Sequence, residues 1–232
     1  MVIRFEINLK MNFDKYSYSH YSFDLWLTLI KSHPDFKIKR SSLLKEYFSI
    51  HKSLEEVHES VRKYDLICNK ISEQTGLHIS FEQIICLILY DLEVGIEDIN
   101  PSVLENLYQK TEYLFLQYKP SLIEPEINKV LSELIKERKT ISILSNTAFI
   151  RGVTLRKILE DYEIGKYFSF QIYSDEVGFS KPNNKIFDLV FEEVMKIKKI
   201  ERKEILHIGD NNFADYDGAL EASFAAYLFR DK

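Results

Sequence analysis

Five short apolar runs with strand character constrain the fold of this chain more than any other feature. They lie at residues 21–27, 141–145, 168–173, 204–208 and 224–229, and helical patterns separate the last four. Strands that alternate with helices at this spacing indicate an α/β fold, an open and mostly parallel sheet covered on both faces. Such sheets bind ligands beyond the C-terminal ends of their strands.

The long interval between the first two runs has a different character. Residues 31–139 carry helical patterns and no convincing strand. One apolar stripe has the three-and-four spacing of an amphipathic helix: Leu54, Val57, Val61, Tyr64 and Ile71. Ser80 with Gln83 resembles a capping box, and Asn100-Pro101 supplies a cap residue followed by proline. A further helix is predicted over 126–139.

These patterns divide the chain into two predicted domains. Residues 1–30 and 140–232 form the sheet-containing core, and residues 31–139 form a helical domain inserted between the first and second strands. So inserted, the helical domain lies beside any site at the strand ends and is positioned to close over it.

The composition excludes several classes of protein. Apolar residues make up 45% of the chain and charged residues 29%, the balance of a globular protein and not of a disordered one. The net charge of −5 argues against a wide nucleic-acid-binding surface. No apolar run approaches the roughly 18 residues of a membrane span. We therefore expect neither nucleic acid nor membrane among the partners, and the oligomeric state is unreadable from the sequence.

The cysteines and the N-terminus indicate a cytoplasmic protein. Cys68 and Cys86 lie 18 residues apart without a CxxC pair, which argues against a disulfide framework and fits a reducing compartment. The first ten residues alternate apolar with charged side chains, which is wrong for a secretory signal. Met1 and Met11 are equally acceptable as translation starts.

Candidate catalytic residues lie at or just after the ends of the predicted strands, with one of them following a loop. They are Asp24, Ser145, Asn146, Lys181, Asp210 and Asp215. A carboxylate can attack phosphorus and form a covalent aspartyl-phosphate, which water then hydrolyses. That chemistry needs a cation to neutralise the phosphoryl oxygens, and a hydroxyl with an amide or ammonium to hold them. The two later carboxylates supply the oxygen ligands that Mg²⁺ prefers.

Each of these residues also has a plain structural interpretation. Asp24 can cap the turn after its strand, and Ser145 can be an ordinary helix N-cap. Lys181 can be a solvated surface charge, and the segment from Asp210 to Asp215 an acidic turn. His207, in the strand before Asp210, is interpreted as packed and hydrogen-bonded.

A basic segment follows the first strand. It contains Lys31, His33, Lys37, Lys39 and Arg40. A solvated positive face is the preferred interpretation, and if the segment faces the cleft it favours anionic substrates.

Four segments, in their order and spacing, resemble motifs one to four of the haloacid dehalogenase-like hydrolase superfamily. They are Asp24-Leu25-Trp26-Leu27-Thr28, Ser145-Asn146, Lys181-Pro182, and Gly209-Asp210 followed by Asp215. The resemblance implies a Rossmann-like, doubly wound parallel sheet with an inserted α-helical cap domain. It implies Asp24 as nucleophile, Ser145 as phosphate ligand beside Asn146, and Lys181 as the charge that orients nucleophile and phosphate. The implied ligands of Mg²⁺ are Asp24, the backbone carbonyl of Trp26, Asp210 and, in support, Asp215.

Trp26 departs from the family pattern. Phosphatases of the family usually have a second Asp here, which protonates the leaving alkoxide and then activates water, and Trp can do neither. General acid–base catalysis is worth roughly 10²–10⁴-fold, or about 3–5.5 kcal/mol of barrier. Its loss affects alkyl phosphates most and acyl or aryl phosphates least. The plain interpretation of Trp26 is that it packs beneath the cap.

The leading hypothesis is a Mg²⁺-dependent phosphatase that acts through an aspartyl-phosphate on a small phosphorylated metabolite. One alternative is a haloacid dehalogenase, a class that resembles this chain in its aromatic residue at position 26. Dehalogenases of the family use no Mg²⁺ and generally lack the Gly-Asp pair, which this chain keeps at Gly209-Asp210. The other alternative is a catalytically impaired phosphate- or metabolite-binding module.

Overall fold

The structure is a computed structural model that describes residues 17–95, 97 and 99–230. The two candidate starts, Met1 and Met11, and the N-terminal pattern used against a secretory signal lie outside these residues. Within the described ranges, no helix is both long and apolar enough to span a membrane. Cys68 and Cys86 are both free thiols.

A five-stranded parallel sheet forms the centre of the molecule, as the apolar runs predict. Its strands stand in the order β5-β4-β1-β6-β7, and every neighbouring pair is parallel. The strands are β1 (His20–Phe23), β4 (Thr140–Ser145), β5 (Phe170–Tyr173), β6 (Ile205–Gly209) and β7 (Ala225–Leu228). Because β1 is the middle strand, its C-terminal end lies at the centre of the sheet edge where ligands bind in such folds.

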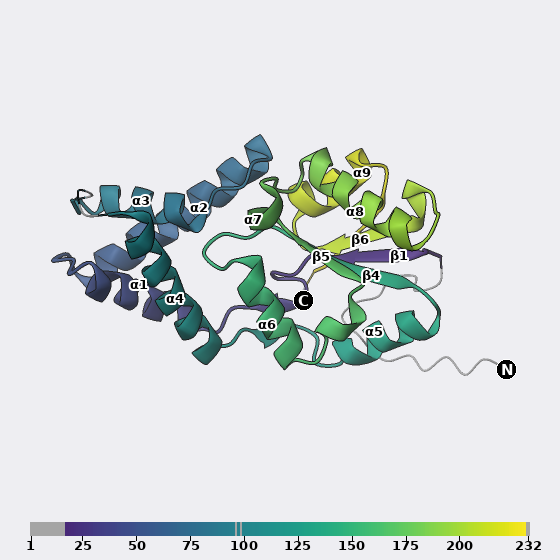
Figure 1. Ribbon diagram of the computed structural model, residues 1–232, viewed down its shortest axis with the longest axis horizontal. Coiled ribbons are helices and arrows are strands. Elements are labelled where there is room, and N and C mark those ends of the chain that lie inside the picture. The colour runs from purple at the N-terminus through teal and green to yellow at the C-terminus, as the bar shows by residue number, and fades with distance from the viewer. Residues whose placement is uncertain (1–16, 96, 98, 231–232) are drawn as a thin grey trace.

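Helices cover both faces of this sheet (Figure 1). Tyr21 and Ile143 point to one face, where they join the core that contains α5 (Ile127–Lys136) and α6 (Gly152–Asp161). Leu144 points to the other face and packs with α8 (Asn184–Ile197). The chain is therefore a doubly wound α/β fold, and the predicted fold class is confirmed. Short elements complete this part: η1 (Gly165–Tyr167), α7 (Ser174–Val177), η2 (Arg202–Glu204), η3 (Asn212–Asp217) and α9 (Gly218–Glu221).

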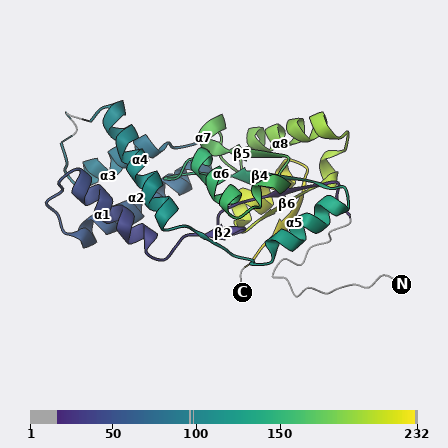
Figure 2. The ribbon, with the colours of Figure 1, turned by 60° about the horizontal axis from the view of Figure 1, so that its bottom comes forward.

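Four helices form a separate group beside the C-terminal edge of the sheet (Figures 1 and 2). They are α1 (Phe36–Tyr47), α2 (Leu54–Thr75), α3 (Phe81–Asp91) and α4 (Pro101–Gln117). We call this group the cap. The two chain connections to it pair as a short antiparallel ribbon, β2 (Ile30–Lys31) with β3 (Ser121–Leu122). The expectation of no strand in this interval was wrong at β3, because two residues are too few to produce a sequence pattern.

The start signals of the cap helices behave as the sequence indicates. Ser80 accepts a hydrogen bond from the Gln83 backbone, and Gln83 accepts one in return, so the capping box is present. Asn100 Oδ1 accepts from the backbone N–H groups of the first turn of α4. These side chains satisfy backbone donors that a helix start otherwise leaves without partners.

The apolar stripe of α2 is rotated from its predicted position. Val57 and Val61 are buried as expected, whereas Leu54 and Ile71 are 36% and 40% exposed. Cys68 is buried in their place. The buried face therefore continues from Val61 through residues 64, 68 and 72, and Ile71 lies about 100° away from position 72 around the helix.

The predicted domain boundaries at residues 30 and 139 stay a prediction. The position of helix α5 does not agree with the second boundary. We expected 126–139 to belong to the inserted domain, but α5 packs against β4, on the sheet side of the molecule. Val130 and Leu131 of α5 are completely buried in that contact. This contact places α5 with the sheet and not with the cap.

Candidate active site

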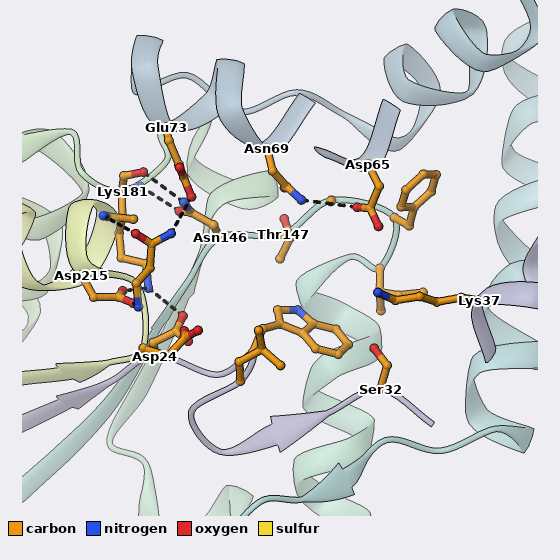
Figure 3. A pocket seen from close by; sticks show the side chains of 18 of the residues that line it. Asp24, Ser32, Lys37, Asp65, Asn69, Glu73, Asn146, Thr147, Lys181 and Asp215 are labelled. Atoms are coloured by element: carbon orange, nitrogen blue, oxygen red, sulfur yellow. Dashed lines mark hydrogen bonds and ion pairs between the residues drawn. The ribbon is translucent and has the colours of Figure 1, made fainter. Parts of the chain in front are cut away.

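The predicted site residues come from the C-terminal ends of three adjacent strands. Asp24 follows β1, Ser145 ends β4 and Asp210 follows β6. A cavity of about 330 Å³ opens at this edge between the sheet and the cap. Figure 3 shows Asp24, Lys181, Asp215, Asn146 and Glu73 gathered at one end of it.

A tight turn follows Asp24 and displaces the chain from the strand. The predicted strand over 21–27 ends at Phe23, although the Asp24 N–H still donates to the Ile208 carbonyl at 2.8 Å. The Leu25 carbonyl accepts from the N–H groups of residues 29 and 30, at 2.9 and 3.0 Å, which closes the turn. Leu27 takes a positive φ of 56°. The apolar run continues past the strand because Leu25 is buried in the core and Trp26 packs against the cap, whereas Leu27 is mostly exposed.

Trp26 lies in this turn and lines the cavity. Its ring centroid is 6.0 Å from that of Phe115 in α4, with the planes tilted by 59°. Trp26 therefore packs beneath the cap, as expected. Position 26 therefore presents an indole ring, and not a carboxylate, to the cavity beside Asp24.

Lys181 is a buried cation that joins the carboxylates. Its side chain is 2% exposed, which rules out the solvated-surface interpretation. Nζ donates to Asp24 Oδ1 at 2.7 Å, to Asp215 Oδ1 at 2.5 Å and to the Leu144 carbonyl at 2.9 Å. Three acceptors satisfy the three N–H donors of the ammonium group. Lys181 is thereby held at a fixed place beside the proposed nucleophile.

Asn146 fixes the backbone of Lys181 from the neighbouring strand end. Its Oδ1 accepts from the Lys181 N–H at 2.7 Å, and its Nδ2 donates to the Lys181 carbonyl at 3.0 Å. Asn146 also lines the cavity. The sequence placed Asn146 next to a substrate, and the structure adds this positioning role.

Ser145 lies behind the cavity wall. Its side chain is completely buried, and Oγ donates to the Asn146 carbonyl at 3.1 Å. It is not among the residues that line the cavity, whereas Asn146 and Thr147 are. The predicted role of Ser145 as phosphate ligand therefore stays a prediction that needs the hydroxyl to turn toward the cavity.

Hydrogen bonds and an ion pair hold the Asp215 carboxylate in place. Oδ2 accepts from the Asn211 N–H at 3.0 Å, and Oδ1 lies 3.1 Å from His207 Nε2 as well as near Lys181. A Cβ at position 209 would overlap the Asp215 carboxyl group, so this approach requires glycine there. The Gly-Asp pair that the sequence singled out thus has a steric reason as well as a chemical one.

The three carboxylates of the site are close enough to share one cation. One oxygen from each of Asp24, Asp210 and Asp215 lies within 4.8 Å of the others. Burial raises the pKa of Asp24 to about 7, and the charges of Asp215 and Asp210 add to the rise while Lys181 opposes it. Burial, together with Asp215, raises the pKa of Asp210 to about 6. One ammonium group therefore leaves excess negative charge, and an oxygen-ligated divalent cation fits it.

The other two charged groups are held in their ionised forms. Burial alone would raise the pKa of Asp215, but Lys181 and the hydrogen bond from His207 hold it well below its usual range. Burial alone would lower the pKa of Lys181, but Asp215 and Asp24 raise it above its ordinary value. Lys181 therefore stays positively charged and Asp215 stays negatively charged.

Several residues that surround the site were not predicted from the sequence. Asp65, Asn69 and Glu73 of α2 line the cavity, and Glu73 Oε1 accepts from Asn211 Nδ2 at 2.7 Å. Their i, i+4, i+8 spacing was the signal, a polar stripe beside the apolar one. His207 is packed and hydrogen-bonded as expected, but its contact with Asp215 was not foreseen.

The basic segment divides between solvent and cavity. Lys31 and Lys39 are exposed, which agrees with the solvated interpretation. Lys37 and Arg40 line the cavity, and Arg40 is only 9% exposed. The preferred interpretation of a wholly solvated face was therefore wrong for Arg40.

Comparison with known proteins identifies the family. The model of the haloacid dehalogenase-like hydrolases matches residues 23–227, which include most of the sheet, the whole cap and every residue of the site. The chain belongs to the haloacid dehalogenase-like hydrolase family.

Two relatives match shorter segments. A hydrolase of Schizosaccharomyces pombe is 35% identical over 100 residues, 42% of this chain and 42% of its own length. The pyrimidine 5'-nucleotidase YjjG of Escherichia coli is 36% identical over 67 residues, 29% of this chain and 28% of its own length. The chain thus matches less than half the length of each relative.

Solved structures show the same fold at low sequence identity. The HAD-hydrolase YfnB of Bacillus subtilis, bound to magnesium, is 20% identical with a TM-score of 0.66, covering 91% of this chain and 88% of its own. The L-2-haloacid dehalogenase of Xanthobacter autotrophicus is 19% identical with a TM-score of 0.57, covering 91% and 77%. The fold therefore accommodates more than one chemistry, and the choice between them depends on the site.

Proposed function

We propose that this protein is a cytoplasmic, Mg²⁺-dependent phosphatase that acts on a small phosphorylated metabolite through an aspartyl-phosphate. The observation that carries the proposal is the group of three carboxylates at the edge of the sheet, two of which pair with the buried Lys181. Asp24, Asp210 and Asp215 would hold the cation, with the Trp26 carbonyl as a further ligand. When bound, Mg²⁺ would neutralise phosphoryl oxygens during the transfer.

The residues of the chain divide the reaction between them. Asp24 attacks the phosphorus, the bond from phosphorus to the leaving oxygen breaks, and an aspartyl-phosphate forms. Water then attacks the same phosphorus, which releases inorganic phosphate and restores Asp24. Lys181 keeps the Asp24 carboxylate oriented through the 2.7 Å bond and supplies positive charge beside the transferring group. Asn146 holds the Lys181 backbone in place.

A substrate panel tests this proposal. We expect hydrolysis of p-nitrophenyl phosphate and acetyl phosphate in Mg²⁺, loss of turnover in EDTA, and a loss of at least roughly 10³-fold in Asp24→Asn because no nucleophile remains. Asp217→Asn is the control, since Asp217 lies two residues after Asp215 but does not line the cavity. Full activity in EDTA or in Asp24→Asn would refute the mechanism.

The same panel separates the alternative functions. The aromatic ring of Trp26 beside the nucleophile, and the similarity to a haloacid dehalogenase fold, favour dehalogenation as the second candidate. Halide release from 2-haloacids in EDTA would establish it. Stabilisation by phosphorylated compounds without any product would instead establish a binding module.

A further inference from the structure

Arg40 is a buried cation for which the described residues provide no complete set of partners. It lies on α1, is 9% exposed and lines the same cavity as Asp24. Its Nε has no hydrogen-bond partner among the described residues. Arg40 forms an ion pair with Asp65, whose Oδ2 is 3.7 Å from Arg40 Nη2, a separation longer than a hydrogen bond. A buried guanidinium with unmade hydrogen bonds is costly unless a ligand makes them.

The surrounding residues hold the guanidinium in one orientation. Its central carbon lies 3.6 Å from the centre of the Phe149 ring and 5.7 Å from that of Phe36. The close contact with the Phe149 ring limits how the guanidinium can turn, and its N–H groups are the donors that remain for a ligand's acceptors. Phe149 is in the segment after Asn146, so the core itself positions this cap residue. A planar fork held in this way is suited to a carboxylate or a phosphate.

The charge at this end of the cavity also favours an anion. Lys37, one turn before Arg40 on α1, lines the same space, and Asp65 is the carboxylate at this end. Figure 3 shows Lys37 and Asp65 at the end of the cavity opposite Asp24 and Lys181. A second cavity beside Arg40 is only about 10 Å³, room for one water and not for an anion. An anion that pairs with Arg40 therefore enters from the large cavity.

We propose that Arg40, with Lys37, binds a second anionic group of the substrate, so that the protein prefers phosphate esters that carry a carboxylate or another phosphate. This inference rests on the proposed function, whose phosphoryl end is at Asp24. The cavity of about 330 Å³ has the size of sites for small metabolites. The substrate class is then a short, doubly anionic metabolite with one charged group at each end of the cavity.

Matched pairs of compounds test the second site. We would compare 3-phosphoglycerate with glycerol 3-phosphate, and the corresponding four- and five-carbon acid and polyol phosphates, because each pair differs by one carboxylate. A third arm compares 1,3-propanediol bisphosphate with the monophosphate and distinguishes a phosphate from a carboxylate. We expect at least one acid to have a KM roughly 10-fold or more below that of its polyol.

Variants assign this preference to Arg40. Arg40→Met should raise the KM for the preferred acid roughly 10- to 100-fold and change the KM for its polyol by less than about 3-fold. Arg40→Lys should lie between, because it keeps the charge but not the fork. Lys39→Met is the control, since Lys39 is an exposed neighbour outside the cavity lining. Equal losses for acid and polyol in Arg40→Met would show a merely structural role and overturn the proposal.

Binding measurements keep this test independent of turnover. If no phosphate ester is hydrolysed, the proposed function fails, and thermal shifts of the wild-type protein with the same pairs still decide the second site. A larger shift with the acid than with the polyol, lost in Lys37→Met or Arg40→Met, supports it. Equal shifts for acid and polyol in the wild-type protein refute it, whether or not the Arg40→Met variant folds.

Discussion

At the scale of single residues, we expect Trp26 to decide which phosphates the proposed enzyme can hydrolyse. It lies two positions after the proposed nucleophile, with its ring against Phe115 of α4. An indole cannot protonate an oxygen leaving group, so the leaving group must depart as an anion or take its proton from water. Glu73 of α2 also lines the cavity, and burial raises its pKa. Glu73 does not take the place of the usual proton donor, however. Its carboxylate accepts a hydrogen bond from Asn211, and it belongs to the cap and not to the turn that follows Asp24.

We expect rates to fall steeply as the leaving group becomes more basic. Aryl phosphates should be hydrolysed at least roughly 10²-fold faster than alkyl phosphates, the lower bound for lost general acid catalysis. Trp26→Asp should accelerate the alkyl phosphates and leave the aryl phosphates nearly unchanged. The measurement is kcat/KM against leaving-group pKa for both proteins, with Trp26→Phe as the control for lost contacts. Equal rates on alkyl and aryl phosphates in the wild-type protein would contradict this role of Trp26.

His20 carries a pH-dependent part of the stability. It is fully buried in β1, with its ring nitrogens 2.7 Å from Thr140 Oγ1 and 2.9 Å from Ser142 Oγ. Burial lowers its pKa from the ordinary 6.5 to about 3. Because the folded state resists protonation, the stability is fully present above pH 6.5 and is lost as the pH falls from 6.5 toward 3.

The size of this loss is measurable. Between about pH 7 and pH 5, the unfolded chain gains about one proton at His20 that the folded chain does not, which lowers the free energy of unfolding by about 2 kcal/mol. We expect His20→Gln to lose about 2 kcal/mol less than the wild-type protein over this range in urea unfolding. His51→Gln, a change at an exposed histidine, is the control. A pH dependence unchanged in His20→Gln would contradict the burial argument.

At the scale of elements, polar contacts fasten the cap to the sheet-containing core. Arg151, at the start of α6, pairs with Glu82 of α3 at 2.5 Å and with Glu105 of α4 at 2.9 Å. Its guanidinium also lies 3.8 Å from the ring centre of Tyr108 in α4. These groups are partly exposed, so each ion pair contributes roughly 1 kcal/mol or less. Their combined effect is on the position of the cap more than on the stability of the fold.

We expect Arg151→Met to release the cap without unfolding the core. The KM for an aryl phosphate should rise by up to about five-fold, the equivalent of about 1 kcal/mol in the closed population. Salt of about 0.5 M should reduce the difference between variant and wild type. Arg156→Met is the matched control, because Arg156 pairs with Glu176 between α6 and α7 and touches no cap helix. Equal KM changes in both variants would contradict the role assigned to Arg151.

At the scale of the whole molecule, cation binding should stabilise the fold. Asp24, Asp210 and Asp215 come from the ends of β1 and β6 and from η3, and Asp24 is far in sequence from the other two. They meet only when the chain is folded, so a cation they share binds the native state and not the unfolded chain. At about ten times its dissociation constant, such a ligand adds about 1.4 kcal/mol.

A melting experiment measures this effect. For a chain of 232 residues, about 1.4 kcal/mol corresponds to a rise in melting temperature of roughly 3–6 °C. We expect this rise in saturating Mg²⁺ and its loss in Asp210→Asn. The variant Asp217→Asn should keep the rise, because that carboxylate lies outside the group. A rise of the same size in Asp210→Asn would show that Mg²⁺ binds elsewhere.

The sheet and the set of candidate residues could be predicted from the sequence. Strand-forming apolar runs have a local cause, because a buried strand needs consecutive apolar side chains whatever lies around it. Helix starts such as Ser80 and Asn100 were also predictable, since a cap satisfies neighbouring backbone groups. Asp24 and Asp210 were found in the same way, because polar residues at the ends of apolar runs are conspicuous, whereas Lys181 follows a loop and was found through the Lys181-Pro182 pair.

Contacts between segments distant in sequence decided which of these residues face the cavity. The Ser145 side chain lies behind the cavity wall, whereas Asn146, the next residue, lines the cavity. No local sequence pattern distinguishes the two. From the sequence, Arg40 was interpreted as part of a solvated basic segment, but in the structure it packs from α1 onto Phe149. The burial of a charge is a property of such contacts and not of the residues beside it in the chain. The sequence therefore indicates the chemistry proposed at Asp24, and only the packing of the cap decides which side chains face that site.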